Sequence, residues 1–339
     1  MDLTPADRSE RSRRIALRLE DAGSIAIATH LGGDGDGWGS ACAIAHHFGS
    51  AGADVRLLAA SPFPPGFRFL LPQGVEPLGP DEAGIEALRS ADLQLVVDAS
   101  EPGRLGEFAA HYRPERTVVI DHHAVANTEI EAALSIIDPA AAATAELVYD
   151  VLVQTGEPIG PETARALYVG LVTDTGSFRY SNTTPHTHRL AATLIEAGAD
   201  PGALYRPLFA NLTPRELGVL RATLDGMERD EELGITWAVL DAGVNRRLGP
   251  LDEYEGVIDQ LRNQEGTEVA ILFRELEDGE VKISFRSSGA ANVAALARSF
   301  GGGGHEKAAG ATVAGDLATV TTEVLEACRT ALAGHDPRT

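Results

Sequence analysis

Aspartate and histidine residues gather at four places in this sequence, in types and spacings that could bind metal ions. The first is the glycine-rich segment His30-Leu31-Gly32-Gly33-Asp34-Gly35-Asp36, which carries one histidine and two aspartates. The others are Asp98, the run Asp121-His122-His123, and Asp174. Hard divalent cations prefer carboxylate oxygens, and an imidazole beside them favours manganese, iron or zinc over calcium. Taken singly, each place is also compatible with a helix cap or a polar turn.

The four places together supply five carboxylates and three imidazoles, and this combination is less expected by chance than any one of them. A pair of metal ions about 3.5–4 Å apart, bridged by one carboxylate, would use such a set of ligands. Ion pairs of this kind activate water and stabilise the charge that develops on phosphoryl oxygens. The residues therefore predict a metal centre suited to phosphoester hydrolysis.

A run of four glycines near the end of the chain could bind an anion. It extends from Gly301 to Gly304 and is followed directly by His305. Glycine lets backbone N–H groups approach a phosphate closely, although a glycine run can equally be a flexible connection.

The elements that must position these residues alternate along the first two thirds of the chain. Strands are predicted over 24–29, 54–59, 93–98, 117–121 and 135–137, and helices over 39–49, 83–89, 143–154, 162–171 and 184–196. This alternation is typical of a parallel sheet with helices packed on both faces. His30, Asp98 and Asp121 then stand where strands end. Since the carboxyl ends of parallel strands line the ligand crevice, we expect these side chains to form one site.

The last third of the chain predicts a second, smaller mixed α/β domain. It is predicted to hold a helical segment over 201–230, a helix over 255–263 and strands over 235–240, 268–276 and 281–286. The last two strands are joined across Glu277-Asp278-Gly279, where Asp-Gly is a strong hairpin signal. We therefore divide the chain into a catalytic domain at 1–200, a helical connector at 201–232 and the smaller domain at 233–339.

Composition and charge restrict the partners and the location of the protein. The 339 residues are enough for about two domains, and 28 Lys and Arg against 50 Asp and Glu give a formal net charge of -22. Such a charge repels long nucleic acid and anionic membranes, so a phosphate must be bound locally. Two distant cysteines, Cys42 and Cys328, and a charged N-terminal segment without an apolar core indicate a cytoplasmic protein that is neither exported nor membrane-spanning.

These motifs resemble those of a known family. His30 with Asp34 and Asp36, then Asp98, the run Asp121-His122-His123 and Asp174, resemble the four motifs of the DHH phosphoesterase superfamily. Arg286 and the segment from Gly301 to His305 resemble its DHHA1 substrate-binding domain. The resemblance extends over residues 24–332, and the order and spacing are similar to the bifunctional oligoribonuclease and PAP phosphatase group, the nanoRNases. That group also includes phosphodiesterases of cyclic di-AMP and its linear product.

The resemblance implies a role for each matching residue. One manganese ion would be held by His30, Asp34 and Asp98, and a second by Asp36, Asp98, His122 and Asp174, with Asp98 as the bridge. Other divalent metals would also suit these ligands. Asp121 would orient the adjacent imidazoles and His123 would face the scissile phosphate, so the catalytic residues are Asp98, Asp121 and His123. The rest of the substrate would be bound by Arg286, His305, Gly303, Gly304 and Arg179.

The first motif departs from the family's usual pattern, His-x-Asn-Pro-Asp-x-Asp-Ala-x-Gly-Ser. Gly32 and Gly33 stand where the pattern has Asn and Pro, and Gly37 stands where it has Ala. All three ligands of the motif are present. The stiff proline turn and the side-chain amide are not, which bears on loop rigidity, turnover and substrate choice.

The resemblance implies a manganese-dependent phosphoesterase of the 3'-5' oligoribonuclease type. It would hydrolyse oligoribonucleotides of about two to five nucleotides, pAp, and cyclic or linear di-AMP, to mononucleotides, and the resemblance is compatible with a homodimer. Two alternatives are an inorganic pyrophosphatase or polyphosphatase of a neighbouring branch and a non-catalytic nucleotide sensor. Arg286 and the glycine run argue against the first, and the retained ligand positions argue against the second.

Overall fold

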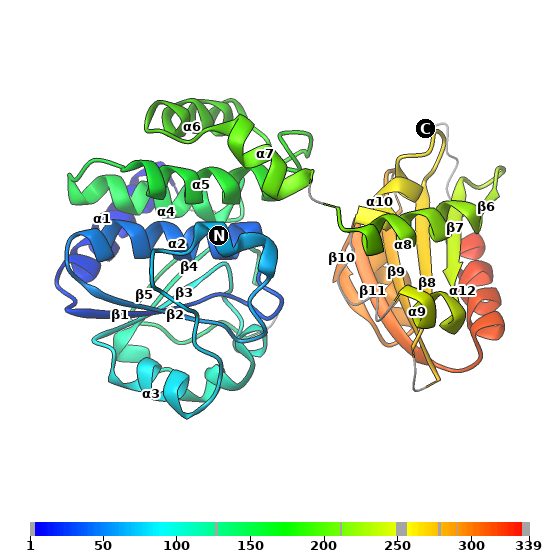
Figure 1. Ribbon diagram of the computed structural model, residues 1–339, viewed down its shortest axis with the longest axis horizontal. Coiled ribbons are helices and arrows are strands. Elements are labelled where there is room, and N and C mark those ends of the chain that lie inside the picture. The colour runs from blue at the N-terminus through cyan, green and yellow to red at the C-terminus, as the bar shows by residue number, and fades with distance from the viewer. Residues whose placement is uncertain are drawn as a thin grey trace. The chain divides into compact units, whose positions relative to one another are not determined.

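The computed structural model describes residues 4–125, 128–210, 212–248, 256–276, 279–289 and 291–333 (Figure 1). The chain divides into two compact units, residues 1–211 and 212–339, each with its own sheet. The three-part domain division drawn from the sequence stays a prediction. Among the described residues, no helix combines the length and the apolar character needed to cross a membrane.

The first unit is built on a five-stranded parallel sheet with the order β2-β1-β3-β4-β5. Its strands are β1 Ser24–Ala28, β2 Asp54–Leu58, β3 Leu93–Val97, β4 Thr117–Asp121 and β5 Leu134–Ile137. Each lies within one residue of the predicted range, and the predicted fold class is confirmed. The strand order reverses between β1 and β3, and in such sheets ligands bind outside the carboxyl ends of the strands at this reversal.

Helices cover both faces of this sheet (Figure 1). They are α1 Pro5–Glu20, α2 Gly35–Ser50, α3 Glu82–Ser90, α4 Thr144–Leu152, α5 Pro161–Asp174, α6 Pro185–Glu196 and α7 Pro201–Phe209. Helices α1, α2, α4 and α5 share one apolar core with the sheet, whereas α3 packs on the opposite face with the 3-10 helix η2, Pro102–His111. Helix α2 is buried along nearly its whole length because α5 covers its outer side.

Helix α2 begins four residues earlier than predicted. The sequence predicted a start at Gly39, whereas the helix starts at Gly35 with Asp34 as its N-cap. The Asp34 side chain accepts hydrogen bonds from the backbone N–H groups of Asp36 and Gly37, which satisfies two otherwise unpaired donors of the first turn. The cap offsets the low helix propensity of a turn that holds Gly35, Gly37 and Gly39.

The second unit holds a six-stranded mixed sheet with the order β10-β11-β9-β8-β7-β6. Its strands are β6 Met227–Asp230, β7 Ile235–Leu240, β8 Val269–Glu275, β9 Glu280–Ser287, β10 Gly303–His305 and β11 Ala308–Ala314. Its helices are α8 Pro214–Asp225, α9 Ala242–Leu248, α10 Gly256–Arg262, α11 Val293–Ser299 and α12 Leu317–Leu332. Strands β8 and β9 pair antiparallel as predicted, while Glu277 and Asp278 of the predicted turn lie outside the described residues. Helices α11 and α12 contribute to one core, and α8, α9 and α10 to another.

Candidate metal centre

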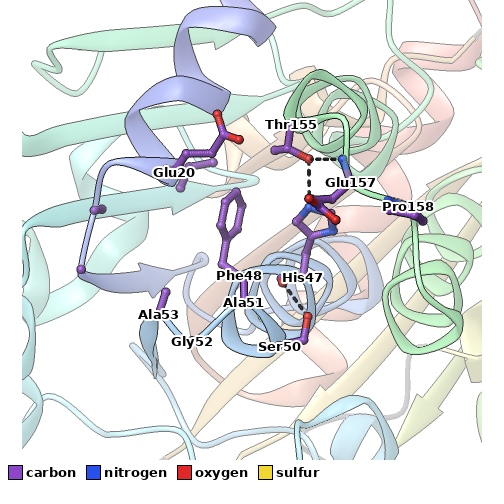
Figure 2. Close-up of a pocket in the computed structure, with 13 residues that line it drawn as sticks. Glu20, His47, Phe48, Ser50, Ala51, Gly52, Ala53, Thr155, Glu157 and Pro158 are labelled. Carbon is purple, nitrogen blue, oxygen red and sulfur yellow. Dashed lines mark hydrogen bonds between the residues drawn. The ribbon is translucent and has the colours of Figure 1, made fainter.

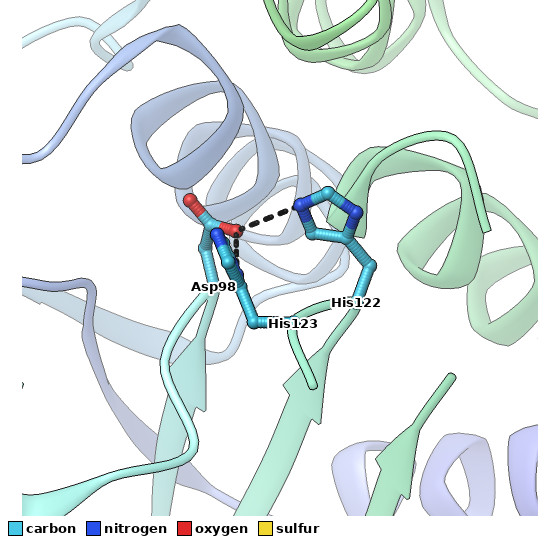
Figure 3. Close-up of side chains that lie close together, drawn as sticks. All are labelled: Asp98, His122 and His123. Atoms are coloured by element: carbon cyan, nitrogen blue, oxygen red, sulfur yellow. Dashed lines mark ion pairs between the residues drawn. The ribbon is translucent and has the colours of Figure 1, made fainter. Parts of the chain in front are cut away.

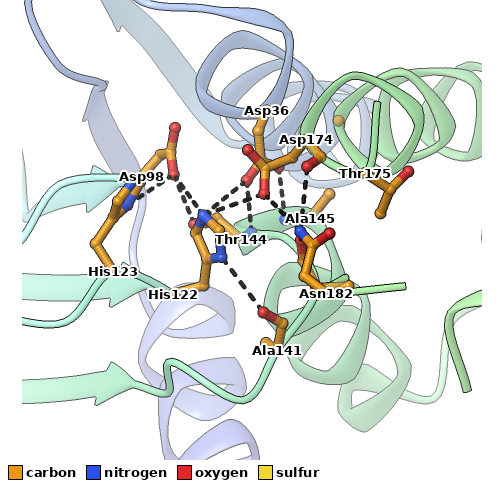
Figure 4. A network of polar contacts seen from close by, with 12 residues as sticks. Asp36, Asp98, His122, His123, Ala141, Thr144, Ala145, Asp174, Thr175 and Asn182 are labelled. Atoms are coloured by element: carbon orange, nitrogen blue, oxygen red, sulfur yellow. Dashed lines mark hydrogen bonds and ion pairs between the residues drawn. The ribbon is translucent and has the colours of Figure 1, made fainter. Parts of the chain in front are cut away.

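The first unit brings the predicted metal ligands together at the carboxyl ends of β1, β3 and β4 (Figure 4). Three groups of side chains have ligand atoms that all lie within 4.8 Å of one another. These groups are His30, Asp34 and Asp98; Asp36, His122 and Asp174; and Asp98, His122 and His123. The shared members make the groups one continuous cluster at the strand reversal.

His30 presents one ring nitrogen to the first group. Its Nδ1 lies 2.8 Å from the carbonyl oxygen of Leu31, and because a carbonyl only accepts, Nδ1 carries the hydrogen. Nε2 lies 3.3 Å from Asp98 Oδ2 and 3.7 Å from Asp34 Oδ2. It is buried and makes no hydrogen bond of ordinary geometry with the described residues. In a neutral ring, Nε2 is therefore the atom that could bind a cation placed between these carboxylates.

His122 is arranged in the same way in the second group. Its Nδ1 lies 3.3 Å from the carbonyl oxygen of Ala141. Its Nε2 lies 3.4 Å from Asp174 Oδ2, 3.8 Å from Asp98 Oδ1 and 3.9 Å from Asp36 Oδ2. This nitrogen is also buried without a hydrogen bond to the described residues. Two imidazoles thus direct unpaired nitrogens at carboxylates, and this donor set fits divalent metal ions.

Asp98 connects the groups because its two oxygens face different ways. Oδ2 faces His30, whereas Oδ1 lies 3.8 Å from His122 Nε2 and 3.5 Å from His123 Nδ1 (Figure 3). The side chain is 1% exposed, and the backbone has a φ of 62°, in the left-handed region that non-glycine residues rarely adopt. Such backbone strain persists where the surroundings fix it, and it is common at functional sites.

Asp36 lies in the first turn of α2 and points at the start of another helix, α4. Its Oδ2 accepts a hydrogen bond of 2.6 Å from the backbone N–H of Thr144, and its Oδ1 accepts one of 2.9 Å from Ala145. The unpaired N–H groups and the dipole at a helix N-terminus stabilise a negative charge. This contact fixes Asp36 although the side chain is only 1% exposed.

The electrostatics of the cluster show an excess of negative charge. Burial, together with repulsion from Asp98 and Asp174, raises the pKa of Asp36 well above its usual value. Burial also raises the pKa of Asp174 to about 6; the attraction of His122 opposes this rise, and repulsion from Asp98 and Asp34 adds to it. Burial alone would lower the pKa of His30, but its contacts with Asp34 and Asp98 raise it to about 10. A divalent cation would relieve this repulsion, so the charge of the cluster fits the predicted metal.

Asp121 contacts only one of the two imidazoles that it was predicted to orient. Its Oδ1 accepts hydrogen bonds from the Nδ1 and the backbone N–H of His123, at 2.8 Å and 3.0 Å. The His122 ring is held by the carbonyl of Ala141 instead. Burial would raise the pKa of Asp121, yet the contacts with His123 lower it, and Asp121 remains a buried anion under the His123 ring.

The loop of the first motif is held by side chains outside the motif. A Cβ at Gly33 would approach Trp38 Nε1 to 2.6 Å, and the Trp38 indole is fixed by Phe63, whose ring centre lies 4.5 Å away. The backbone N–H of Gly32 donates to Ser61 Oγ at 2.8 Å. Leu31 donates to the carbonyl of Arg104 at 2.7 Å. In this chain, packing against Trp38 requires the glycine that stands in place of proline, and these contacts replace the stiffness of the proline.

Sequence reasoning missed two polar residues of the site. Thr144 Oγ1 donates to Asp98 Oδ1 at 2.9 Å. Asn182 Nδ2 donates to the carbonyls of Ala142 and Asp174, at 2.9 Å and 3.1 Å. Neither residue belongs to a motif, and nothing in the sequence marks them apart from nearness to predicted ligands.

The predicted substrate-binding residues fall in both units. Arg179 lies just after α5 in the first unit, and its Nε donates to the carbonyl of Gly176 at 2.6 Å. In the second unit, strand register places Arg286 of β9 and His305 of β10 opposite Ala308 of β11. Gly303 and Gly304 also lie on β10. The substrate-binding roles of these residues stay predictions.

A pocket of about 550 Å³ lies by the amino ends of β1 and β2, whereas the metal-ligand cluster lies at the carboxyl ends of the strands (Figure 2). It is lined by the ends of α1 and α2 and by residues near Thr155, and in it His47 Nε2 lies 3.2 Å from Thr155 Oγ1. None of the predicted site residues line it. The volume of a cavity is therefore a poor guide to the chemistry of this unit.

The fold and the aspartate–histidine cluster define a two-unit α/β protein with a candidate metal centre. Residues 24–171 match the DHH family, N-terminal domain, and residues 250–333 match the DHHA1 domain. A bifunctional oligoribonuclease and PAP phosphatase NrnA of Thermus thermophilus is 32% identical over 329 residues, covering 94% of each chain. The chain belongs to the DHH family of phosphoesterases, in the DHHA1-containing branch of its NrnA-type relatives.

Further relatives agree with this assignment. A cyclic-di-AMP phosphodiesterase GdpP of Geobacillus thermodenitrificans is 32% identical over 230 residues, covering 66% of this chain and 33% of that protein. A crystal structure of an exopolyphosphatase-related protein from Bacteroides fragilis has a TM-score of 0.88 at 24% identity, covering 98% of both chains. RecJ from Thermus thermophilus in complex with Mn²⁺ has a TM-score of 0.59 at 17% identity, covering 97% of this chain and 55% of RecJ. The two structures show a shared fold.

Proposed function

We propose that this protein is a manganese-dependent phosphoesterase that hydrolyses short nucleotides to mononucleotides. The observation that carries the proposal is the position of Asp98, which lies between His30 on one side and His122 on the other. The relative from Thermus thermophilus is named an oligoribonuclease and PAP phosphatase, and the structurally similar RecJ binds Mn²⁺. The substrates that we propose are oligoribonucleotides of two to five nucleotides, pAp, and cyclic or linear di-AMP.

Two metal ions would use all six clustered ligands. One would be held by His30, Asp34 and Asp98, and the other by Asp36, Asp98, His122 and Asp174. When bound, such ions supply activation of water and stabilise charge on the phosphoryl oxygens. We propose manganese because the set combines hard carboxylate oxygens with only two imidazoles, and other divalent metals remain compatible with it.

His123 is the residue that we propose to contact the scissile phosphate. Its Nδ1 proton is held by Asp121 at 2.8 Å, which fixes the ring beside Asp98. Burial would lower the pKa of His123, but the contacts with Asp121 and Asp98 raise it, so the ring retains a proton more readily than a free histidine. A protonated imidazole at this place would stabilise negative charge on the phosphate.

Two arginines of the first unit are our candidates for contacts with further phosphates. Arg104 lies in the segment after Asp98, and its positive charge lowers the pKa of His123, opposing the effect of Asp121. Its side chain makes no hydrogen bond or ion pair with any residue in the described part of the chain. Arg179 follows α5 and is exposed. One arginine can donate two parallel N–H hydrogen bonds to two oxygens of a phosphate, and its guanidinium stays charged at every physiological pH.

The second unit would bind the rest of the substrate through Arg286, His305 and the amides of Gly303 and Gly304. This proposal is supported by the match of residues 250–333 to the DHHA1 domain and by the neighbouring positions of β9, β11 and β10. Long nucleic acid and membranes are not among the partners that we propose, because the net charge is -22. We further propose a cytoplasmic location and a capacity to form homodimers.

The experiment that tests the function is a parallel turnover assay on the chelator-treated full chain. The nucleotide substrates are pAp, linear di-AMP, cyclic di-AMP and a three-nucleotide RNA. Pyrophosphate and polyphosphate are tested separately as substrates of the alternative enzyme class. We expect mononucleotide release from short nucleotides that returns with Mn²⁺ and not with Ca²⁺. Turnover of pyrophosphate alone would favour the pyrophosphatase alternative, and tight nucleotide binding without turnover would favour a sensor.

A further inference from the structure

We propose that Thr144 is a positioning residue that fixes the orientation of the Asp98 carboxylate between the two groups of ligands. The inference rests on the proposed function in one respect, namely that these groups bind metal ions. Thr144 lies outside the four motifs, and it is the first residue of α4. Its side chain is completely buried, so its hydroxyl has no access to solvent.

Thr144 contacts an aspartate of both groups at once (Figure 4). Its hydroxyl donates to Asp98 Oδ1 at 2.9 Å, and its backbone N–H donates to Asp36 Oδ2 at 2.6 Å. Both acceptors are buried carboxylates. Hydrogen bonds to charged acceptors are shorter and stronger than those between neutral groups, and burial strengthens them further. Thr144 therefore sets the distance between Asp98, which both groups share, and Asp36, which belongs to the second group.

The hydroxyl matters because the end of an aspartate side chain rotates easily. The torsion that turns a carboxylate has a broad, twofold distribution, so the backbone does not determine which way the plane faces. In the structure, Oδ2 of Asp98 faces His30 at 3.3 Å and Oδ1 faces His122 at 3.8 Å. A bridge between two ions requires this division of the two oxygens. The donor on Thr144 selects it by binding Oδ1 from the side of α4.

The Thr144 hydroxyl can be removed without loss of the other contacts that this segment makes with the site. The neighbouring contacts of this segment to the site are made by backbone atoms, namely the carbonyls of Ala141 and Ala142 and the N–H of Ala145. Substitution at position 144 leaves those contacts and the N–H bond to Asp36 in place. Thr144→Val removes the hydroxyl at nearly constant volume, and Thr144→Ser keeps it.

The test measures Mn²⁺ binding to the full chain by titration calorimetry, which requires no substrate. A hydrogen bond to a charged group changes an equilibrium by about tenfold or more, so we expect Thr144→Val to bind Mn²⁺ about tenfold more weakly. Thr144→Ser should return the affinity to near the wild-type value. Electron paramagnetic resonance adds a second readout, because a carboxylate bridge through Asp98 holds two ions close together and strengthens their spin coupling. We expect Thr144→Val to weaken the coupled signal.

Thr163→Val is the matched control. Thr163 is a buried threonine in the first turn of α5, and it precedes Asp174 by about 16 Å along that helix. It should leave both the affinity and the spectrum unchanged. Wild-type affinity and coupling in a folded Thr144→Val protein would overturn the positioning role, and Thr144→Ala takes its place if the valine variant does not fold. Failure of the wild type to turn over nucleotides while it binds Mn²⁺ would instead count against the proposed function.

Discussion

The two units of the molecule place their functional groups by different means. In the first unit, ligands from four separate segments converge: three segments follow β1, β3 and β4, which are parallel and end together, and the fourth ligand, Asp174, ends α5. In the second, the antiparallel register of β9, β11 and β10 places Arg286 and His305 on either side of Ala308. The first arrangement collects negative groups and the second supplies a positive one. The comparison leads us to propose a division of labour, in which the first unit performs the chemistry and the second binds the substrate.

The sharpest test of this division replaces the bridging carboxylate in the first unit. We expect Asp98→Asn to lower kcat by about a thousandfold or more, because a neutral amide cannot bridge two metal ions. The fold should survive, since asparagine also tolerates the left-handed backbone found at position 98. Turnover, metal content and melting temperature should be measured together. Near-wild-type turnover would rule out a dinuclear centre built on Asp98.

A second test removes the positive group of the second unit. Arg286→Ala should lower kcat/KM by about 10- to 100-fold, the range expected for a lost charge-assisted hydrogen bond. Its metal content should equal that of the wild type. Lys282→Ala is the control, because Lys282 lies on the same strand and the same face, four residues away. Loss of metal in the Arg286 variant would show that the division between the units is wrong.

The smallest expected effect concerns substrate length. The cationic groups assigned to the substrate are enough for one or two phosphates beyond the one that is cleaved, and the net charge of -22 repels a longer strand. We expect kcat/KM to be greatest for two to five nucleotides and to fall by roughly fivefold to tenfold for an RNA of about 20 nucleotides. A ladder of oligoribonucleotides at fixed salt measures this. Constant or rising efficiency with length would reveal a basic path that the assigned residues do not include.

The sequence predicted those features that depend on local patterns. Each strand of the first sheet lies within one residue of its predicted range, because buried parallel strands are continuous apolar runs with clear ends. The clustering of the predicted metal ligands other than Asp174 also followed from their places at or just beyond strand ends, whereas Asp174 ends α5. The predicted start of α2 was wrong by four residues, since the glycine-rich segment after Asp34 was interpreted as a turn rather than as the first turn of the helix.

The sequence could not predict contacts that depend on the backbone of distant segments. The alanine-rich segment from Ala140 to Ala145 has no chemistry in its side chains apart from the hydroxyl of Thr144. In the fold, its carbonyls and N–H groups hold His122, Asn182 and Asp36. Such groups are present in every residue, so no motif marks them. The roles in substrate binding are equally hidden, because they depend on both units.

The close contact of α2 with α5 has a consequence for which substitutions this protein can accept. A Cβ at Gly39 would lie 2.6 Å from the carbonyl of Ala166 on α5, and one at Gly170 would lie 2.7 Å from Asp36 Oδ1. Asp36 belongs to α2 and Asp174 to α5, so the spacing of these two ligands is set where the helices touch. Mutational tolerance at positions 39 and 170 is therefore governed by the spacing of the two candidate ligands, although neither glycine carries a group that could take part in the chemistry.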